Sequence, residues 1–550
     1  MKAPLQRCLV AMPVDGRPAV RSQVQALAAA AGWQLLMPEV AALGHLRQPA
    51  DRAALGRWLL DHAAQADGFV LSVDMLAYGG LVPSRFIRDT LAELQARLAV
   101  IDELRQRWPD KPVYAFAATL RISNNDVADE EKPYWAAHGR QLWRWSFHSD
   151  RAASSQAEDS VAEAAAAAAL IPAAVRADYR STRERNFALT RGLLQAVQDG
   201  RITRLVLPQD DTAEWGFNVA ERRALQAEVA ARGLQGRVAI YAGADEVMHT
   251  LCAHLVRRLV GCAPLRVALS CSDPEHIARL VPLYEDRPVM QGVASQMQAV
   301  GAVLIDSATV DGDPFGTRQK APRPGVDADW LLALHTQGTA QGDWAMRRPL
   351  PQRVAVASTW FEGIAAWQAA GRPVALADLA FANGGDPWLL AQPALKLSAL
   401  AAYAGWNTAG NSLGSVLAHA ALMDAAEIDR ADDATAPASP TWNAAAARQA
   451  TALRLLEDGL YQAQLRQALR DSIDECSVDA ATLQHRAQAQ VLPTANAWAA
   501  AHGLGVLVTG LRLPWDRTFE VDLRVESAAP EDQTGRDAQM PAARDRLRTD

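Results

Sequence analysis

The sequence has few cysteines, no block of basic residues and no long apolar run. Its five cysteines form no close CxxC pair, so neither a disulfide framework nor a structural zinc site is expected, and a reducing cytoplasm is favoured. No apolar run approaches the length that crosses a bilayer. The net charge of −7 argues against a nucleic-acid-binding surface. We therefore expect a cytoplasmic protein without nucleic-acid or membrane partners.

The sequence also lacks a P-loop, a dinucleotide-binding fingerprint, an HExxH motif and a nucleophile elbow. The short apolar run near the N-terminus breaks at Pro13 and Asp15, which indicates a first strand rather than a signal peptide. No motif specifies a cofactor by itself, and none is expected.

Short apolar runs alternate with helical stretches through the first half of the chain. The expected strands are residues 8–13, 34–37, 68–73, 113–118, 204–207, 238–241 and 266–270. The expected helices are residues 18–31, 53–66, 90–107 and most of 124–201, with a loop near 146–160. This alternation predicts an α/β fold, in which parallel sheets are flanked by helices. A single elaborated (β/α)8 barrel is the alternative.

An internal repeat indicates that the α/β unit occurs twice. The segment 14–18 and the helix after it match the segment 284–288 and its following helix, with Arg17 and Arg287 separated by 270 positions. A chance match of two helices that share an Arg-Pro start is the alternative.

Strand ends further along the two halves also correspond. A strand that ends at Asp74 before a Gly-Gly pair matches one that ends at Asp378, and 116–126 loosely matches 401–414. The predicted organisation is a first α/β half at 1–262, a second at 263–425, a helical region with a terminal β-hairpin at 426–526 and a disordered tail at 527–550.

Two adjacent carboxyl groups follow one of the predicted strands directly. The apolar run 205–207 is typical of a buried parallel strand, Pro208 is expected to end it, and Asp210 and Asp211 come next. Ligands bind outside the carboxyl ends of such strands, and in a desolvated pocket one of two neighbouring carboxyl groups has a raised pKa. Asp210 and Asp211 are therefore candidate catalytic groups, with Trp215 beside them. The alternative is that Asp211 caps the next helix and Asp210 is solvated.

Polar loops follow the other strands of both halves. They carry carboxylates, amides and aromatic faces, which together can bind a polyhydroxylated substrate. Because the carboxyl ends of parallel strands meet at one edge, we expect these loops to line one cleft. The candidate substrate-binding residues are Asp15, Arg17, Asp74, Tyr78, Arg85, Trp215, Asp245, Glu246, Asn383, Asp386, Trp406, Asn407 and Asn411. Taken singly, each loop is equally explained as a helix cap or a polar turn.

Eight segments in order resemble the bacterial domain-of-unknown-function family 4127. They are PVDGRP, VDMLAYGGLVPSR, LPQDD, YAGADE, YEDRP, FANGGD, AYAGWNTAGNSLG and LPWDRTFE, and they extend from residue 13 to residue 520. The resemblance covers nearly the whole chain and implies no particular activity. An alanine-rich insertion near 150–175 departs from the family pattern and lies away from these segments.

The Asp–Asp pair is also similar to that of the family 84 glycoside hydrolases, the O-GlcNAcase type. In those enzymes one aspartate orients the substrate acetamido group as an internal nucleophile, and the other is the general acid/base. The resemblance implies that Asp210 orients the substrate and Asp211 is the acid/base, with Asn407 beside Trp406 as a hydrogen-bond donor. Those enzymes have a single (β/α)8 barrel, whereas the repeat here suggests two α/β units.

Two functions are compatible with these patterns. The first is a hydrolase, of the glycoside hydrolase kind, acting on a small-molecule or oligosaccharide substrate without a cofactor. The second is a divalent-metal-dependent enzyme or small-ligand-binding protein in which Asp74, Asp210, Asp211 and Asp245 supply oxygen ligands. The aromatic and amide-rich loops favour the first function, and the number of strand-end aspartates favours the second.

Overall fold

The computed structural model describes residues 7–305, 328–432 and 443–528, and the tail predicted at 527–550 lies almost entirely outside these ranges. Six strands form a parallel sheet, called here the first sheet, in the order β2-β1-β3-β4-β5-β6. They are β1 (Cys8–Met12), β2 (Gln34–Leu36), β3 (Gly68–Ser72), β4 (Val113–Phe116), β5 (Arg204–Gln209) and β6 (Val238–Ala242).

The strand β5 continues through Pro208, where the sequence predicted that it would end. The carbonyl of Pro208 accepts a hydrogen bond from Thr119 N, so the proline nitrogen faces the β4 side of the strand. The regular hydrogen-bond ladder between β4 and β5 ends at Phe116 and Val206. Pro208 lies beyond this point, so the lack of an N–H group on the proline leaves no hydrogen bond of the ladder unmade. Extending β5 to Gln209 brings Asp210 directly onto the edge of the sheet.

Five strands form the second sheet, which is also parallel and has the order β13-β11-β9-β7-β8. They are β7 (Leu265–Cys271), β8 (Ala302–Leu304), β9 (Trp330–His335), β11 (Val374–Asp378) and β13 (Ala402–Ala404). A short pair beside it consists of β10 (Gly342–Asp343) and β12 (Phe381–Ala382).

The two sheets share one strand order, because β8-β7-β9-β11-β13 repeats the pattern β2-β1-β3-β4-β5. The predicted α/β fold with two similar halves is confirmed, and the alternative of a single closed barrel is wrong. Arg17 and Arg287 both lie between the first strand of a half and its first long helix. In this correspondence β3 matches β9, and β4 matches β11. Asp74 follows β3, whereas Asp378 ends β11. The predicted match of Asp74 with Asp378 is therefore wrong by one strand.

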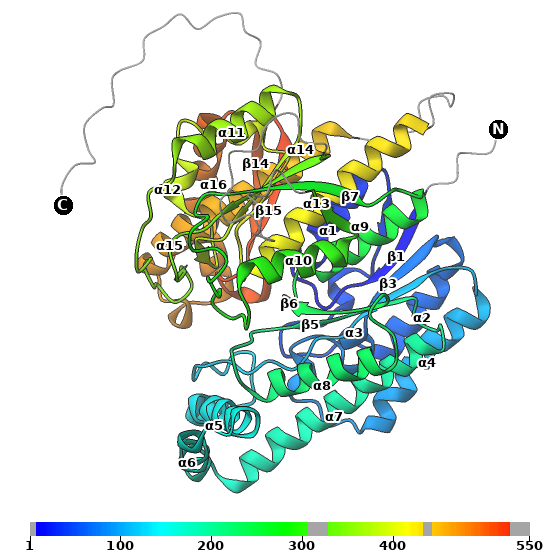
Figure 1. The fold of residues 1–550 in the computed structure, drawn as a ribbon. Coiled ribbons are helices and arrows are strands. Elements are labelled where there is room, and N and C mark those ends of the chain that lie inside the picture. Colours follow the sequence, from blue (N-terminus) through cyan, green and yellow to red (C-terminus); the bar gives the residue numbers. More distant parts are fainter. Residues whose placement is uncertain (1–6, 306–327, 433–442, 529–550) are drawn as a thin grey trace, which may run out of the picture.

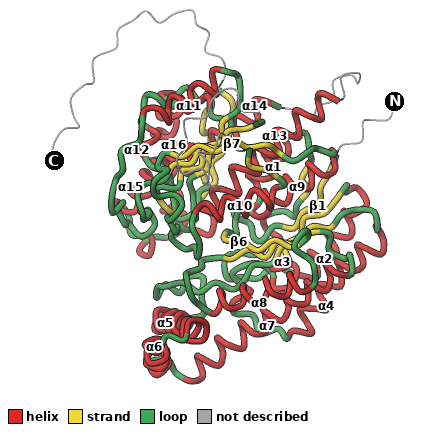
Figure 2. The backbone as a smooth tube through the Cα atoms, viewed as in Figure 1, coloured by secondary structure: helices red, strands yellow, loops and turns green. Residues whose placement is uncertain are grey.

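Three of the four hydrophobic clusters of the described residues form layers, with helices outside and between the two sheets (Figures 1 and 2). The middle layer contains α1 (Ser22–Ala30), α9 (Val247–Val260), α10 (Val289–Val300) and α13 (Ala409–Asp432). The outer face of the first sheet is covered by α2 (Arg52–His62), α3 (Val73–Tyr78), α4 (Leu91–Arg107), α7 (Ala173–Gln198) and α8 (Phe217–Ala231). Because the middle helices pack on both sheets, they fix the two halves against each other.

The outer face of the second sheet is covered by C-terminal elements together with two earlier helices. They are α11 (Ser358–Ala369), α12 (Pro387–Leu390), the π-helix η6 (Leu455–Leu465), α15 (Arg466–Ser472), α16 (Ala480–Ala501) and the hairpin β14 (Val506–Arg512) and β15 (Asp522–Ser527). The helix α14 (Ala444–Arg454) precedes η6 and packs against α1. The residues between the hairpin strands, 513–521, are called here the hairpin bend.

A loop was predicted near 146–160, but α5 (Trp135–Ser155) runs to Ser155 and α6 (Glu158–Ala169) follows at once. The polar residues that suggested a loop have a different role. Ser146 Oγ accepts a hydrogen bond from Phe217 N, and Asp150 accepts one from Gly216 N. These buried side chains accept hydrogen bonds from backbone N–H groups at the start of α8, which have no partner within the helix. The prediction of a loop near 146–160 is wrong.

Among the described helices, none by itself is long and apolar enough to cross a membrane. Only α6 and α7 taken together, bent by 111°, meet the criteria of length and composition.

Candidate active site

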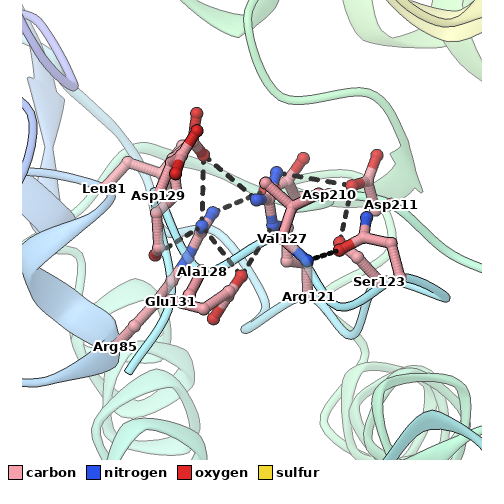
Figure 3. A network of polar contacts seen from close by, with 12 residues as sticks. Leu81, Arg85, Arg121, Ser123, Val127, Ala128, Asp129, Glu131, Asp210 and Asp211 are labelled. Carbon is pink, nitrogen blue, oxygen red and sulfur yellow. Dashed lines mark hydrogen bonds and ion pairs between the residues drawn. The ribbon is translucent and has the colours of Figure 1, made fainter. Parts of the chain in front are cut away.

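Charged side chains gather at the carboxyl edge of the first sheet, where loops from several strands meet the hairpin bend. Figure 3 shows the part of this group around Arg85, Arg121 and Asp210. We call this group the acid–arginine cluster. It consists of Arg17, Arg85, Arg121 and Arg517 with Asp15, Glu130, Glu131, Asp210, Asp211, Asp245 and Glu520.

The Asp210–Asp211 pair lies at one end of the cluster, and each carboxylate has its own arginine. Arg85 Nη2 lies 3.3 Å from Asp210 Oδ2, and Arg121 Nη1 lies 3.4 Å from Asp211 Oδ2. Ser123 Oγ also donates a hydrogen bond to Asp211 Oδ2, at 3.1 Å. Asp211 has a left-handed backbone, with φ of 38°, which an aspartate tolerates better than most residues. Both side chains remain partly exposed, Asp210 by 16% and Asp211 by 21%.

The loop after β4 closes the cluster from one side. Glu131 accepts hydrogen bonds from Arg85 at 3.0 Å and from Arg121 at 3.1 Å, so that it ties the two arginines together (Figure 3). Glu130 contacts Arg85, Arg121 and Arg517. Although burial raises the pKa of Glu130, these guanidinium groups hold it well below its ordinary value. Glu130 is therefore a fixed negative charge.

Arg17 organises the opposite end. Its guanidinium bonds Asp15 at 2.9 Å and Asp245 at 2.7 Å, and Glu520 lies 3.8 Å away. The Trp515 ring lies under the same guanidinium, 5.0 Å from its centre. Arg17 is 6% exposed, and a buried guanidinium requires such partners because its desolvation is costly.

The hairpin bend brings C-terminal residues to this site. Arg517 contacts Glu130 at 2.8 Å and Glu520 at 2.7 Å. The bend is anchored from the π-helix, where Tyr461 donates to Thr518 O and Gln462 donates to Phe519 O, both at 2.8 Å. Residues more than 300 positions apart in the sequence therefore build one site.

The environment of Asp210 shifts its protonation. Burial first, and the neighbouring charge of Asp211 second, raise the pKa of Asp210 to about 7, although Arg121 and Arg85 oppose this. Asp211 is held by Arg121 and Ser123. The two carboxyl groups thus have different environments, which is the arrangement that lets one act as an acid while the other stays ionised.

Other predicted site residues are buried close to the cluster. Asp74 accepts a hydrogen bond from Ala118 N at 2.9 Å, and burial raises its pKa to about 7. Glu246 accepts from Gln296 at 2.9 Å, and burial raises its pKa to about 8. Tyr78 is buried, with the Arg185 guanidinium 5.7 Å from its ring.

The second half contributes through the loop after β13. Asn407 donates to Asp245 Oδ2 at 2.7 Å, and Asn411 Oδ1 accepts from the amides of Ala244 and Asp245. The Trp406 ring lies 6.0 Å from that of Phe519 in the hairpin bend. Asn407 and Asn411 thereby position Asp245, and through it Arg17.

Three predicted residues make their contacts elsewhere. Asp386 pairs with His335 at 3.0 Å and with Arg353 at 2.7 Å, on the second sheet. Asn383 donates its side-chain amide to Asp343, although its backbone N–H reaches Asn407 O. Trp215 lies under the Arg223 guanidinium.

Sequence reasoning missed five residues of the cluster, and also Trp515 beside it. The five are Arg121, Glu130, Glu131, Arg517 and Glu520. Arg121 could have been found, since it follows the strand end of β4 as closely as the selected residues follow theirs. Trp515, Arg517 and Glu520 lie in the segment LPWDRTFE, which the family resemblance had already singled out.

Within the described residues, no group of three or more His, Cys, Asp or Glu side chains is arranged to hold a metal ion. The four aspartates proposed as oxygen ligands each have another partner. Asp74 binds a backbone amide, Asp210 binds Arg85, Asp211 binds Arg121, and Asp245 binds Arg17.

Comparison with known proteins gives one match. A family model described as "Protein of unknown function (DUF4127)" matches residues 9–524. No curated protein and no solved structure matches the chain. These comparisons do not support the resemblance to the family 84 glycoside hydrolases.

Proposed function

Because this chain belongs to the DUF4127 family of proteins of unknown function, we propose its activity from the site: a hydrolase that uses Asp210 and Asp211 as an acid–base pair. The observation that carries this proposal is the difference between the two neighbouring carboxyl groups. Asp210, with a pKa of about 7, can give up or take a proton near neutral pH, while Asp211 is held by Arg121 and Ser123.

The surroundings favour an uncharged, polyhydroxylated substrate, and hence a glycoside. The cluster has seven carboxyl groups and four guanidinium groups, and every guanidinium is already paired with a carboxylate. An anionic substrate would have to compete with these carboxylates. A sugar can instead use both the donors and the acceptors of such pairs, and Trp515, partly exposed, supplies an apolar face.

In this scheme the Asp210 carboxylic acid protonates the glycosidic oxygen while the acetamido oxygen of the substrate attacks the anomeric carbon, so that the bond to the leaving alcohol breaks and a cyclic oxazoline forms. The Asp210 carboxylate then deprotonates the water that attacks the anomeric carbon and reopens this ring. Asp211, which contacts Arg121 and Ser123, orients the substrate by accepting a hydrogen bond from the N–H of that acetamido group. These roles are the reverse of those implied by the family 84 resemblance, because the raised pKa belongs to Asp210. Asn407 is proposed to orient substrate indirectly, through Asp245 and Arg17.

The test is a screen of aryl glycosides, acetamido sugars included, with wild-type protein and with Asp210→Asn, Asp211→Asn and Glu214→Gln. General acid–base groups contribute about 100- to 10,000-fold to rate, so Asp210→Asn should lower kcat by about that factor. Glu214 is exposed in the same loop and serves as the matched control, with unchanged activity expected. Melting temperature should change little in Asp210→Asn, since removing the repulsion with Asp211 offsets the lost contact with Arg85.

Each run is repeated with EDTA. Full activity in Asp210→Asn, or absence of hydrolysis of every glycoside, would refute the proposal. Activity that survives both substitutions but disappears with EDTA would favour a metal-dependent reaction instead.

A further inference from the structure

A small chamber, lined mostly by apolar surface, lies away from the acid–arginine cluster. Its volume is about 30 Å³, and it is bordered by α1, α9, α13 and α14 together with Tyr403 of β13. Its lining includes His249, His419, Ser415, Arg454 and Gln23. None of these residues belongs to the cluster, so the chamber is a separate feature.

Three nitrogen atoms at this chamber have no hydrogen-bond partner among the described residues. They are His249 Nδ1, His419 Nε2 and Arg454 Nε. His249 is 6% exposed and His419 is 4% exposed. A buried polar atom left without a partner costs about 1–3 kcal/mol, so two unsatisfied histidines at one cavity indicate that something else satisfies them.

The chamber offers mainly hydrogen-bond donors. Burial, and next the charge of Arg454, lower the pKa of His249 to about 3 and that of His419 to about 4, so both rings are neutral and each carries one N–H. The two nearby acids do not line the chamber: Glu457 accepts from Gln23 at 2.5 Å, and Asp458 pairs with Arg454 at 2.7 Å through Oδ2. A group rich in acceptors, such as a carboxylate, complements what remains.

A surface groove of about 600 Å³ adjoins the chamber. It lies between α1, α14 and the hairpin β14–β15, which pack beside one another (Figure 1). The residues that line both spaces are Gln23, Ala26, Ala450 and Leu453. The other apolar residues of the groove are Ala29, Ala446, Leu511, Leu523 and Val525. The groove has the size of an ordinary small-molecule pocket, which spans about 300–1,000 Å³.

We propose that the groove and the chamber together bind an amphipathic carboxylate. The carboxylate occupies the chamber and accepts hydrogen bonds from His249, His419 and Arg454. The apolar chain lies in the groove along α1 and α14. This site is independent of the proposed hydrolase activity, and neither proposal depends on the other.

The first experiment is calorimetric titration of the full-length protein with hexanoate, octanoate and decanoate. The alcohol and the primary amine of the same chain lengths serve as head-group controls. We expect the carboxylates to bind most tightly. The dissociation constant should fall by up to about fourfold for each added methylene, which corresponds to at most about 0.8 kcal/mol per buried methylene. Equal binding of all three head groups, or tightest binding of the amine, would overturn the assignment of the chamber.

The second experiment separates head-group recognition from simple adsorption. His249→Phe and His419→Phe keep a ring in place but remove the donors, and each should weaken octanoate binding at least tenfold. Ala26→Phe, beside both spaces, should block the chamber and have the same effect. Ala29→Phe, which borders only the outer groove, is the matched control and should leave the carboxylate preference intact.

If the His→Phe variants unfold, Ala26→Phe and Ala29→Phe still test the proposal, because both alanines are exposed and tolerate substitution more easily. Loss of the carboxylate preference in Ala29→Phe as well as in Ala26→Phe, or no binding by wild-type protein, would refute the site and assign the unpartnered nitrogens to internal water.

Discussion

Arg17 connects three separate segments of the chain. It pairs with Asp15 beside it, with Asp245 after β6, and lies over Trp515 in the hairpin bend. Removing one member of a buried ion-pair network leaves uncompensated charges, at a cost of about 3–5 kcal/mol. Arg17→Met should therefore lower the free energy of unfolding by about that amount, measured by chemical denaturation.

The matched control is Arg512→Met. Arg512 also pairs with an aspartate, Asp522, but the two side chains are 54% and 30% exposed. Exposed pairs contribute about 0–1 kcal/mol. Similar losses in the two variants would show that the Arg17 contacts are not coupled as the structure indicates.

Residues directly after strand ends were the predictable part of the site. Asp15, Asp210 and Asp245 carry polar groups at the edge of a parallel sheet, and that position follows from the strand pattern alone. Glu130 and Arg517 could not be found in this way. Their positions depend on contacts between residues far apart in the sequence. Glu130 contacts both Arg85 and Arg517.

At the scale of elements, the close approach of α13 to β6 depends on glycine. A Cβ atom at Gly410 would lie 2.2 Å from Ala242 O, a backbone atom that cannot move aside freely. Gly410 N also donates to Glu285 at 2.5 Å. Gly410→Ala should therefore destabilise the protein by about 1–3 kcal/mol, as overpacking does, and lower the melting temperature.

Gly192, within α7, is the matched control, because a Cβ atom added there would have no other atom within 4 Å. Gly192→Ala should stabilise the protein by up to about 1 kcal/mol through helix propensity. If both variants melted above the wild type, the close approach of α13 to β6 would be wrong.

Elements were predictable where the chain follows a simple period. The runs that became β1, β3 and β4 are buried and apolar, and the sequence placed each within a few residues. The π-helix η6 could not be predicted, because its wider turn is stabilised by tertiary contacts. Asp458 of η6, for example, accepts a hydrogen bond from Gly405 N, which directly follows β13.

At the scale of the whole molecule, the repeat predicted two α/β halves but not how they associate. The middle helices are apolar on more than one face because they contact both sheets. A helix buried entirely within one half would show the same apolar pattern, so the sequence alone does not reveal that these helices lie between the halves. The arrangement also encloses carboxyl groups between the halves. Glu246 and Glu285 lie there. Gln296 donates to Glu246 and to Gly410 O, and Gly410 N donates to Glu285.

These enclosed carboxyl groups predict an unusual dependence of stability on pH. Burial raises the pKa of Asp378 to about 6, of Asp74, Asp210 and Glu285 to about 7, and of Glu246 to about 8. In the folded state each group therefore binds a proton that it loses more easily when unfolded. Their contribution to stability is complete below about pH 4 and is lost as pH rises to about 8. The buried histidines His249 and His419, whose pKa is lowered to about 3 and about 4, oppose this below about pH 6.5. The melting temperature should therefore fall most steeply between about pH 6.5 and 8, as calorimetric scans would show.

Glu246→Gln tests this dependence at the joint between the halves. Glutamine keeps the shape of the protonated acid and its acceptor for Gln296, but it cannot ionise. Each pKa unit corresponds to about 1.4 kcal/mol, so the variant should gain stability relative to wild type as pH rises, with the largest difference near pH 8. Glu39→Gln, at a side chain that is 93% exposed, is the control and should leave the slope unchanged. Parallel curves for wild type and Glu246→Gln from pH 5 to 8 would show that Glu246 is ionised in the folded protein. Ionisation would require a cationic partner, and none of its hydrogen bonds among the described residues supplies one.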